Sequence, residues 1–175
     1  MTDTKEATYY GKYRGVVFNN IDPENRGRIQ AMVPDVTSLI PSTWAEACVP
    51  LAGGPPPMGI YVVPPIGANV WIEFEQGDPN YPVWTGCMWG FQAEVPALAL
   101  AGVPGDPNIV LQTTGQNTLM LSDLPGPTGG IMLKNTSGAM ILVNDIGITI
   151  SNSKGATITL IGNTITMNQG ALTII

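Results

Sequence analysis

The sequence contains no histidine, and only 11% of its 175 residues are charged. Without histidine, the chain lacks the side chain that most often transfers protons in enzymes and binds metals at neutral pH. Basic residues are also few, seven against 13 acidic ones, and the net charge of −6 argues against a partner held through its phosphates. We therefore expect no nucleic-acid partner, no cofactor, no metal and no catalytic centre.

Long hydrophobic runs are absent as well, although 44% of the residues are hydrophobic. No stretch approaches the roughly 20 apolar residues that a membrane-spanning helix needs. Residues 2–6 (TDTKE) have neither the basic start nor the apolar middle of a secretory signal, so we expect a soluble chain made in the cytoplasm. Cys48 and Cys87 lie in apolar settings, which favours two buried thiols in a reducing compartment over a disulfide.

Charge divides the sequence into two parts, because residues 1–100 carry 15 of the 20 charged side chains and residues 101–175 carry five. Between them, residues 95–107 (VPALALAGVPGDP) contain three prolines and two glycines without alternation, as is typical of a linker. We predict a first domain at 1–100, a linker at 101–107 and a second domain at 108–175.

The first part contains short β-rich runs separated by turn signals. Two of these turns are predicted at residues 22–27 (DPENRG) and 77–80 (GDPN). Val70, Ile72 and Phe74 alternate with polar or aromatic neighbours, which predicts a strand with one face toward a core. Five or six strands of this kind fit one small barrel, and we expect them at residues 15–19, 27–33, 47–51, 59–63, 68–74 and 83–88.

The second part has a glycine every seven to nine residues, at positions 130, 138, 147, 155, 162 and 170. Short β-branched segments lie between these glycines, so this part is a repeat of about eight strands. Within the segments, apolar residues share one face and mostly Thr and Ser the other. The predicted apolar core consists of Ile148, Ile150, Ile158, Leu160, Ile165, Met167, Leu172 and Ile174.

Each repeat offers only two inward side chains, so one copy buries little apolar surface. We reason that single strands would also leave backbone groups unpaired unless other chains supplied neighbours. Three copies wound around one axis satisfy both needs, which predicts a homotrimer and an intertwined triple-stranded β-helix on the order of 35 to 40 Å long. The structural alternative is a monomeric parallel β-helix with fewer than three coils.

Residues 13–90 resemble the oligosaccharide/oligonucleotide-binding (OB) barrel of phage central spikes, the family of baseplate assembly protein V, also found within VgrG proteins of type VI secretion. The matching segments, in order, are residues 11–36 (GKYRGVVFNNIDPENRGRIQAMVPDV), residues 44–50 (WAEACVP) and residues 75–86 (EQGDPNYPVWTG), with glycines and Pro65 between them. The glycine-punctuated second part looks like the trimeric β-helix that follows this barrel in the family. The expected fold class is therefore all-β, an OB barrel followed by a trimeric β-helix.

The resemblance implies a spike in a contractile injection machine of the phage-tail kind. The barrel trimer would sit on a separate hub protein, with residues 1–8 as a flexible or hub-contacting N-terminal extension. Sheath contraction would then drive the needle through the target membrane. We assign the hub contact to four basic residues near the first hairpin, Lys12, Arg14, Arg26 and Arg28. A PAAR-type tip protein would suit the apolar end formed by Leu172, Ile174 and Ile175.

Other readings of single residues are weaker. Glu73 and Glu75 suit a solvated strand face better than a glycosidase pair, and Asp22, Asp78 and Asp106 each precede a proline, as turn residues do. The aromatic residues of the barrel suit packing better than stacking on bases or sugars, because no basic groove accompanies them. The competing function is a β-helical adhesin or a carbohydrate-binding OB module.

Overall fold

The computed structural model describes residues 7–174 of the chain. The predicted N-terminal extension at residues 1–8 lies outside the described residues except for Ala7 and Thr8. Ile175 lies outside them entirely, and of Thr173 and Ile174 only the backbone is described. The structure separates into two compact units, Met1–Gly90 and Phe91–Ile175. Strands dominate both units, which confirms the prediction of an all-β chain.

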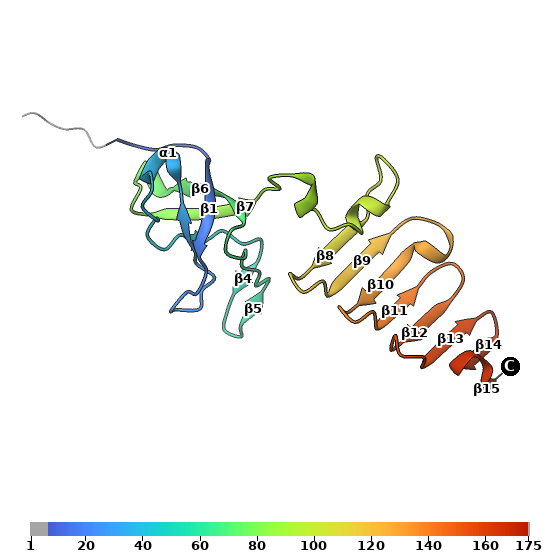
Figure 1. The fold of residues 1–175 in the computed structure, drawn as a ribbon. Coiled ribbons are helices and arrows are strands. Elements are labelled where there is room, and N and C mark those ends of the chain that lie inside the picture. Colours follow the sequence, from blue (N-terminus) through green and yellow to red (C-terminus); the bar gives the residue numbers. More distant parts are fainter. Residues whose placement is uncertain (1–6, 175) are drawn as a thin grey trace, which may run out of the picture. The chain divides into compact units, whose positions relative to one another are not determined.

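The first unit is built around a five-stranded sheet with the strand order β2-β1-β6-β7-β3 (Figure 1). Neighbouring strands are antiparallel except for β3 and β7, which run parallel. A single turn of helix, α1 (Pro34–Thr37), follows β2, and a 3₁₀ turn, η1 (Glu75–Gly77), follows β6. The strands are β1 (Tyr13–Asn19), β2 (Gln30–Met32), β3 (Glu46–Ala47), β6 (Asn69–Phe74) and β7 (Pro82–Cys87).

The core of this unit lies on one face of the sheet. Along β6, Val70, Ile72 and Phe74 are buried while the residues between them are partly exposed, so the predicted alternation is confirmed. The other core residues come from β1, β2, β7 and the segments beside them: Val17, Ile29, Ala31, Val33, Ala45 and Trp84.

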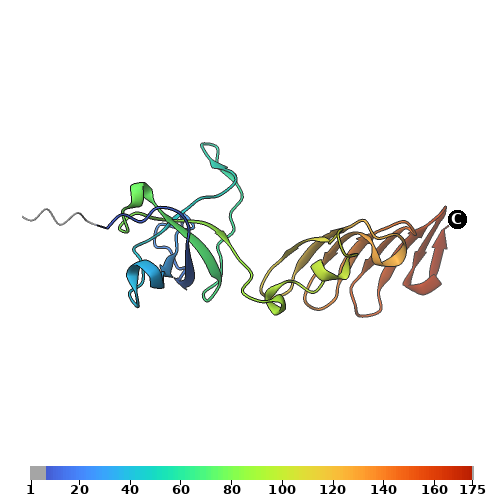
Figure 2. The same ribbon diagram turned by 90° about the horizontal axis from the view of Figure 1, so that it is seen from above.

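A separate two-stranded hairpin replaces two of the predicted strands. β4 (Ala52–Gly53) pairs with β5 (Met58–Gly59), and neither strand joins the main sheet. Pro55, Pro56 and Pro57 at the tip lack backbone N–H groups, so this part of the chain cannot extend a ladder. We call residues 48–63 the arm; in both views it extends away from the sheet of its unit (Figures 1 and 2).

The second unit is an eight-stranded antiparallel sheet in which each strand pairs with the next strand in the chain (Figures 1 and 2). Glycines at the predicted spacing lie in the connections or, for Gly130, at the start of a strand, and those at 130, 138, 147, 155 and 162 have positive φ. Four 3₁₀ turns are also present, η2 (Gln92–Glu94), η3 (Ala99–Ala101), η4 (Gly126–Thr128) and η5 (Asn168–Gly170). The strands are β8 (Ile109–Gln112), β9 (Thr118–Ser122), β10 (Gly130–Lys134), β11 (Met140–Val143), β12 (Ile148–Ser151), β13 (Thr157–Ile161), β14 (Thr164–Met167) and β15 (Leu172–Ile174).

This topology corrects one step of the sequence argument. Within residues 109–174, each strand finds its ladder partners in its own chain, so the expectation that other subunits must supply them is wrong. Tight turns of a few residues allow consecutive strands to pair antiparallel. Any reason for the chain to trimerise therefore lies in its side chains and not in unpaired backbone groups.

Two further expectations concern the cysteines and membrane-spanning helices. Cys48 and Cys87 are both free thiols, and both are exposed, so the prediction that they are buried is wrong. Among the described residues, none of the helices has the length and apolar character needed to cross a bilayer.

Candidate assembly surface

One face of the eight-stranded sheet carries only apolar side chains, and we call it the front face. The strand registers arrange these side chains in two columns, one from β8 to β14 and one across all eight strands. The first column is Ile109, Leu121, Ile131, Val143, Ile148, Leu160 and Ile165, and the backbone of Ile174 continues its register in β15. The second column is Leu111, Leu119, Leu133, Ile141, Ile150, Ile158, Met167 and Leu172.

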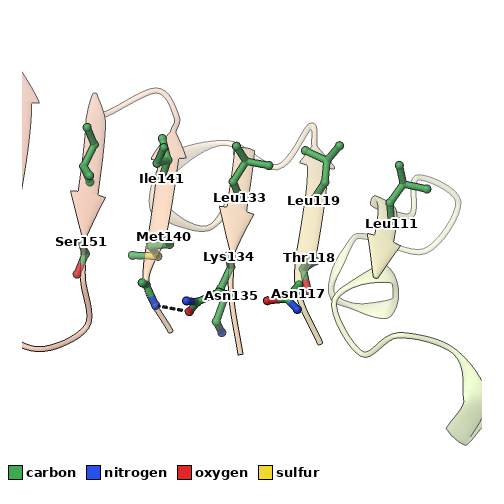
Figure 3. Close-up of a pocket in the computed structure, with 12 residues that line it drawn as sticks. Leu111, Asn117, Thr118, Leu119, Leu133, Lys134, Asn135, Met140, Ile141 and Ser151 are labelled. Carbon is green, nitrogen blue, oxygen red and sulfur yellow. Dashed lines mark hydrogen bonds between the residues drawn. The ribbon is translucent and has the colours of Figure 1, made fainter. Parts of the chain in front are cut away.

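The front face is open in the single chain. Leu111 is 67% exposed at one end of the second column, and Leu172 is 51% exposed at the other. Figure 3 shows the side chains of Leu111, Leu119, Leu133 and Ile141 projecting to the same side of their strands, where they line a groove. Contiguous apolar surface of this extent is typical of a protein–protein interface.

The opposite face, the back face, changes character along the sheet. Met120 and Met132 are buried on it, and the Asn108 side chain lies against Met120, donating from Nδ2 to Leu98 O at 2.7 Å. Farther along, the back-face positions opposite one another are Thr149, Thr159 and Thr166. Partly exposed threonines need no partner, because their hydroxyls can bond to water.

The predicted trimer-core residues therefore share one surface. Ile148, Ile150, Ile158, Leu160, Ile165, Met167 and Leu172 all belong to the two columns, and the backbone of Ile174 pairs opposite Ile165. Their burial against other subunits stays a prediction. The same holds for docking of a tip protein at Leu172, Ile174 and Ile175.

Sequence reasoning missed the half of the front face that β8 to β11 supply. In MILV both faces of the strand are apolar, and in TLMLS a methionine interrupts the polar face, so alternation gives a weaker signal there. The repeat could have been extended toward the N-terminus, because each of these earlier strands also places two residues on the front face, two positions apart.

The basic residues proposed for hub contact are all engaged within their own chain. Lys12 Nζ lies 3.0 Å from Glu73 Oε1, Arg14 lies over the ring of Trp71, and Arg26 bonds to Glu24 and Glu46. Lys12, Arg14 and Arg26 are exposed and remain accessible to a partner. Their contact with a hub stays a prediction.

Arg28 differs because it is buried against Asp22. Its Nη2 donates to Asp22 Oδ1 at 2.6 Å, and the same carboxylate accepts the backbone N–H groups of Glu24, Arg26 and Arg28. The bond from Arg28 is the main cause that holds the pKa of Asp22 well below its ordinary value, and the backbone donors add to it. Asp22 thus forms the first hairpin turn, as its sequence context predicts.

The other acidic candidates are bonded to neighbouring groups, and one of the aromatic candidates packs in the barrel. Glu73 pairs with Lys12, Asp78 accepts from the backbone N–H of Asn80, and Asp106 closes a turn with Val103. In residues 7–174 there is no cluster of three or more side chains that could hold a metal ion. Trp84 is buried and donates from Nε1 to Gly27 O at 3.0 Å, which assigns it to packing of the barrel.

A small OB-type barrel followed by a sheet with one open apolar face is the arrangement of a protein whose second part packs against another protein surface. Comparison with family models identifies both parts. Residues 13–89 match the type VI secretion system/phage-baseplate injector OB domain, and residues 108–173 match the phage baseplate V C-terminal trimerisation domain. The chain belongs to the phage baseplate V family and is a baseplate spike protein of the VgrG-like type.

The matches support conclusions about the oligomeric state, the assembly and the role of the chain. The trimerisation domain supports a homotrimer, and a baseplate component is assembled into a phage-tail-like particle. Both matched families are structural components of baseplates. A comparison with curated proteins found no match.

Proposed function

We propose that the chain is the central spike of a contractile injection machine and pierces the target membrane when the sheath contracts. The observation that carries this proposal is the front face, where two apolar columns continue without interruption from β8 to β14 and one of them reaches β15 at Leu172. Burying them at a threefold axis would give a needle whose centre is dry along its whole length. Residues 1–100 form the base, residues 101–107 the linker and residues 108–175 the needle.

The antiparallel sheet supports a mechanical role. Seven consecutive ladders join eight strands, so a force along the needle passes through each ladder in turn and is shared among the backbone hydrogen bonds of that ladder. Three such sheets packed front to front would resist bending more than any one sheet, because each side chain of the columns is then locked by neighbours on all sides. Force on the barrels would reach the tip without buckling.

The partners of the spike follow from its two ends. A separate hub trimer holds the barrels through Lys12, Arg14, Arg26 and Arg28, and of these the exposed three are the main contact because Arg28 is occupied by Asp22. A PAAR-type tip protein covers the end at Leu172, Ile174 and Ile175. The spike contributes no catalysis to entry.

The test is complementation in a particle that lacks its own spike. Particles carrying the intact chain should contract and breach target membranes, as followed by dye entry into target cells. Particles with a needle weakened by Ile158→Asp should assemble sheath and tube poorly or fail to breach. If particles carrying a barrel without residues 108–175 breach membranes as well as complete ones, the piercing role is refuted.

A further inference from the structure

The arm, residues 48–63, carries no charged side chain. No charged residue occurs between Glu46 and Glu73, although charged side chains are spaced throughout residues 12–46. The arm also exposes large apolar side chains: Tyr61 is 70% exposed, Met58 57% and Ile60 51%. An uncharged projection with an apolar surface is costly in water, so it indicates a contact with another apolar surface.

The arm is also too small to be stable alone. β4 and β5 share two residue pairs, Ala52 with Gly59 and Gly53 with Met58, and one further bond runs from Ile60 N to Leu51 O at 2.9 Å. Two-stranded hairpins of this size are at best marginally stable unless they pack on something. Its base does so, since a Cβ added at Gly27 would lie 3.5 Å from the Tyr61 ring and 3.6 Å from Val63.

A second apolar patch lies on β1 of the same barrel. Val17 points into the core, while Val16 and Phe18 on either side of it point outward and are 40% and 53% exposed. Ile66 is also exposed, and its backbone lies beside β1, because the N–H of the following residue, Gly67, donates to Val17 O at 2.9 Å. We call Val16, Phe18 and Ile66 the β1 patch.

We propose that, in the trimer, the arm of each subunit packs on the β1 patch of the neighbouring subunit and so clasps the three barrels into a ring. The proposal rests on the trimer described above. A contact repeated around a threefold axis joins two different surfaces of each copy, and the ring closes when all three are paired. Each chain carries one arm and one β1 patch, so the ring leaves neither surface unpaired.

A second copy suits the arm better than a partner that diffuses in. Interfaces that form between free proteins typically bury at least about 1,000 Å² with good complementarity, and a contact limited to the tip of the arm and three patch residues is small on that scale. Without charge, the arm cannot attract a distant partner electrostatically. Copies already joined through their trimerisation domains meet at effective concentrations on the order of millimolar, where a weak apolar contact is enough.

The experiment measures how accessible the arm is in the assembled protein. Cys48 and Cys87 are exposed and unpaired, so both can be replaced by serine in the full chain before Met58→Cys is introduced. We expect a maleimide to react with position 58 at least about tenfold more slowly in the trimer than in the trimer-breaking variant Ile158→Asp. The matched control, Leu39→Cys, is 87% exposed and should react quickly in both backgrounds.

A second measurement locates the contact. In the trimer, Met58→Cys combined with Phe18→Cys should give disulfide-linked trimers on mild oxidation, because the two cysteines lie in contact, whereas Met58→Cys combined with Leu39→Cys should not. Fast labelling of position 58 in a proven trimer would overturn the clasp, and cross-linking to position 39 in place of position 18 would overturn the receiving face. Neither outcome affects the spike proposal, which is tested separately by the mass of the chain and by the breach of membranes with and without residues 108–175.

Discussion

Ile158 and Thr159 are consecutive residues of β13, yet their side chains belong to opposite faces of the eight-stranded sheet. Ile158 stands between Ile150 and Met167 in an apolar column, whereas Thr159 stands opposite Thr149 and Thr166. Two substitutions one residue apart therefore distinguish the surface that assembles from the surface that faces water.

The first prediction uses this pair of residues. Ile158→Asp places three carboxylates near the trimer axis, where desolvation and mutual repulsion should cost several kcal/mol, on the order of the penalty for burying unpaired polar groups. We expect loss of the trimer, measured by light scattering. Thr159→Asp carries the same charge on the back face and should leave the mass unchanged; equal behaviour of the two variants would contradict the front-face assignment.

The second prediction concerns the glycines that turn the chain between strands. Gly130 and Gly155 both have strongly positive φ, at +91° and +101°, so alanine is strained at either position. Only at Gly130 would a Cβ overlap the carbonyl oxygen of Val143; at Gly155 the space is open. Gly130→Ala should therefore lower the melting temperature of the second unit clearly more than Gly155→Ala, as followed by circular dichroism.

The third prediction tests the packing of the barrel. Trp84→Phe removes the indole N–H that bonds to Gly27 O and leaves a buried carbonyl unpaired, which should lower the free energy of unfolding by about 1–3 kcal/mol. Trp89→Phe is the control, because Trp89 is 63% exposed. Chemical denaturation followed by fluorescence compares the two, and a larger loss from the control would refute the packing role.

The fourth prediction is a pH dependence that originates at Asp22. Its pKa is lowered in the folded chain, chiefly by the bond from Arg28, so the folded state favours the ionised carboxylate. That contribution is complete above the ordinary pKa of 3.8 and is lost as the pH falls below it toward the lower folded value. Asp22→Asn should flatten the loss of thermal stability in this acidic range, whereas Asp35→Asn, at an exposed position of α1, should not.

The sequence predicted those features that depend on local patterns. Alternation along Val70, Ile72 and Phe74 identified a half-buried strand, and the spacing of glycines identified the repeat and its number of strands. Asp22 was recognised as a turn residue because an aspartate before proline has a local reason to be there, and its bonds to the following N–H groups confirm that reason.

Features that depend on tertiary pairing were harder to predict. Whether a strand pairs with its own chain or with another copy is not encoded in its alternation, so the antiparallel pairing of β8 to β15 was missed. The arm was missed because residues 47–51 and 59–63 have the β propensity of barrel strands. Only Gly59 and the prolines before it indicate that the chain forms a separate hairpin here. Cys48 and Cys87 look buried by their apolar neighbours in sequence, but both are exposed in the structure.

The central claim is that the front faces of three chains bury one another. The most direct test is the mass of the intact chain in solution, measured by light scattering coupled to size-exclusion chromatography. We predict three times the mass of one chain, with a single cooperative unfolding transition for the second unit. A stable species of single-chain mass with the eight-stranded sheet intact would contradict the account, because the two apolar columns would then face water.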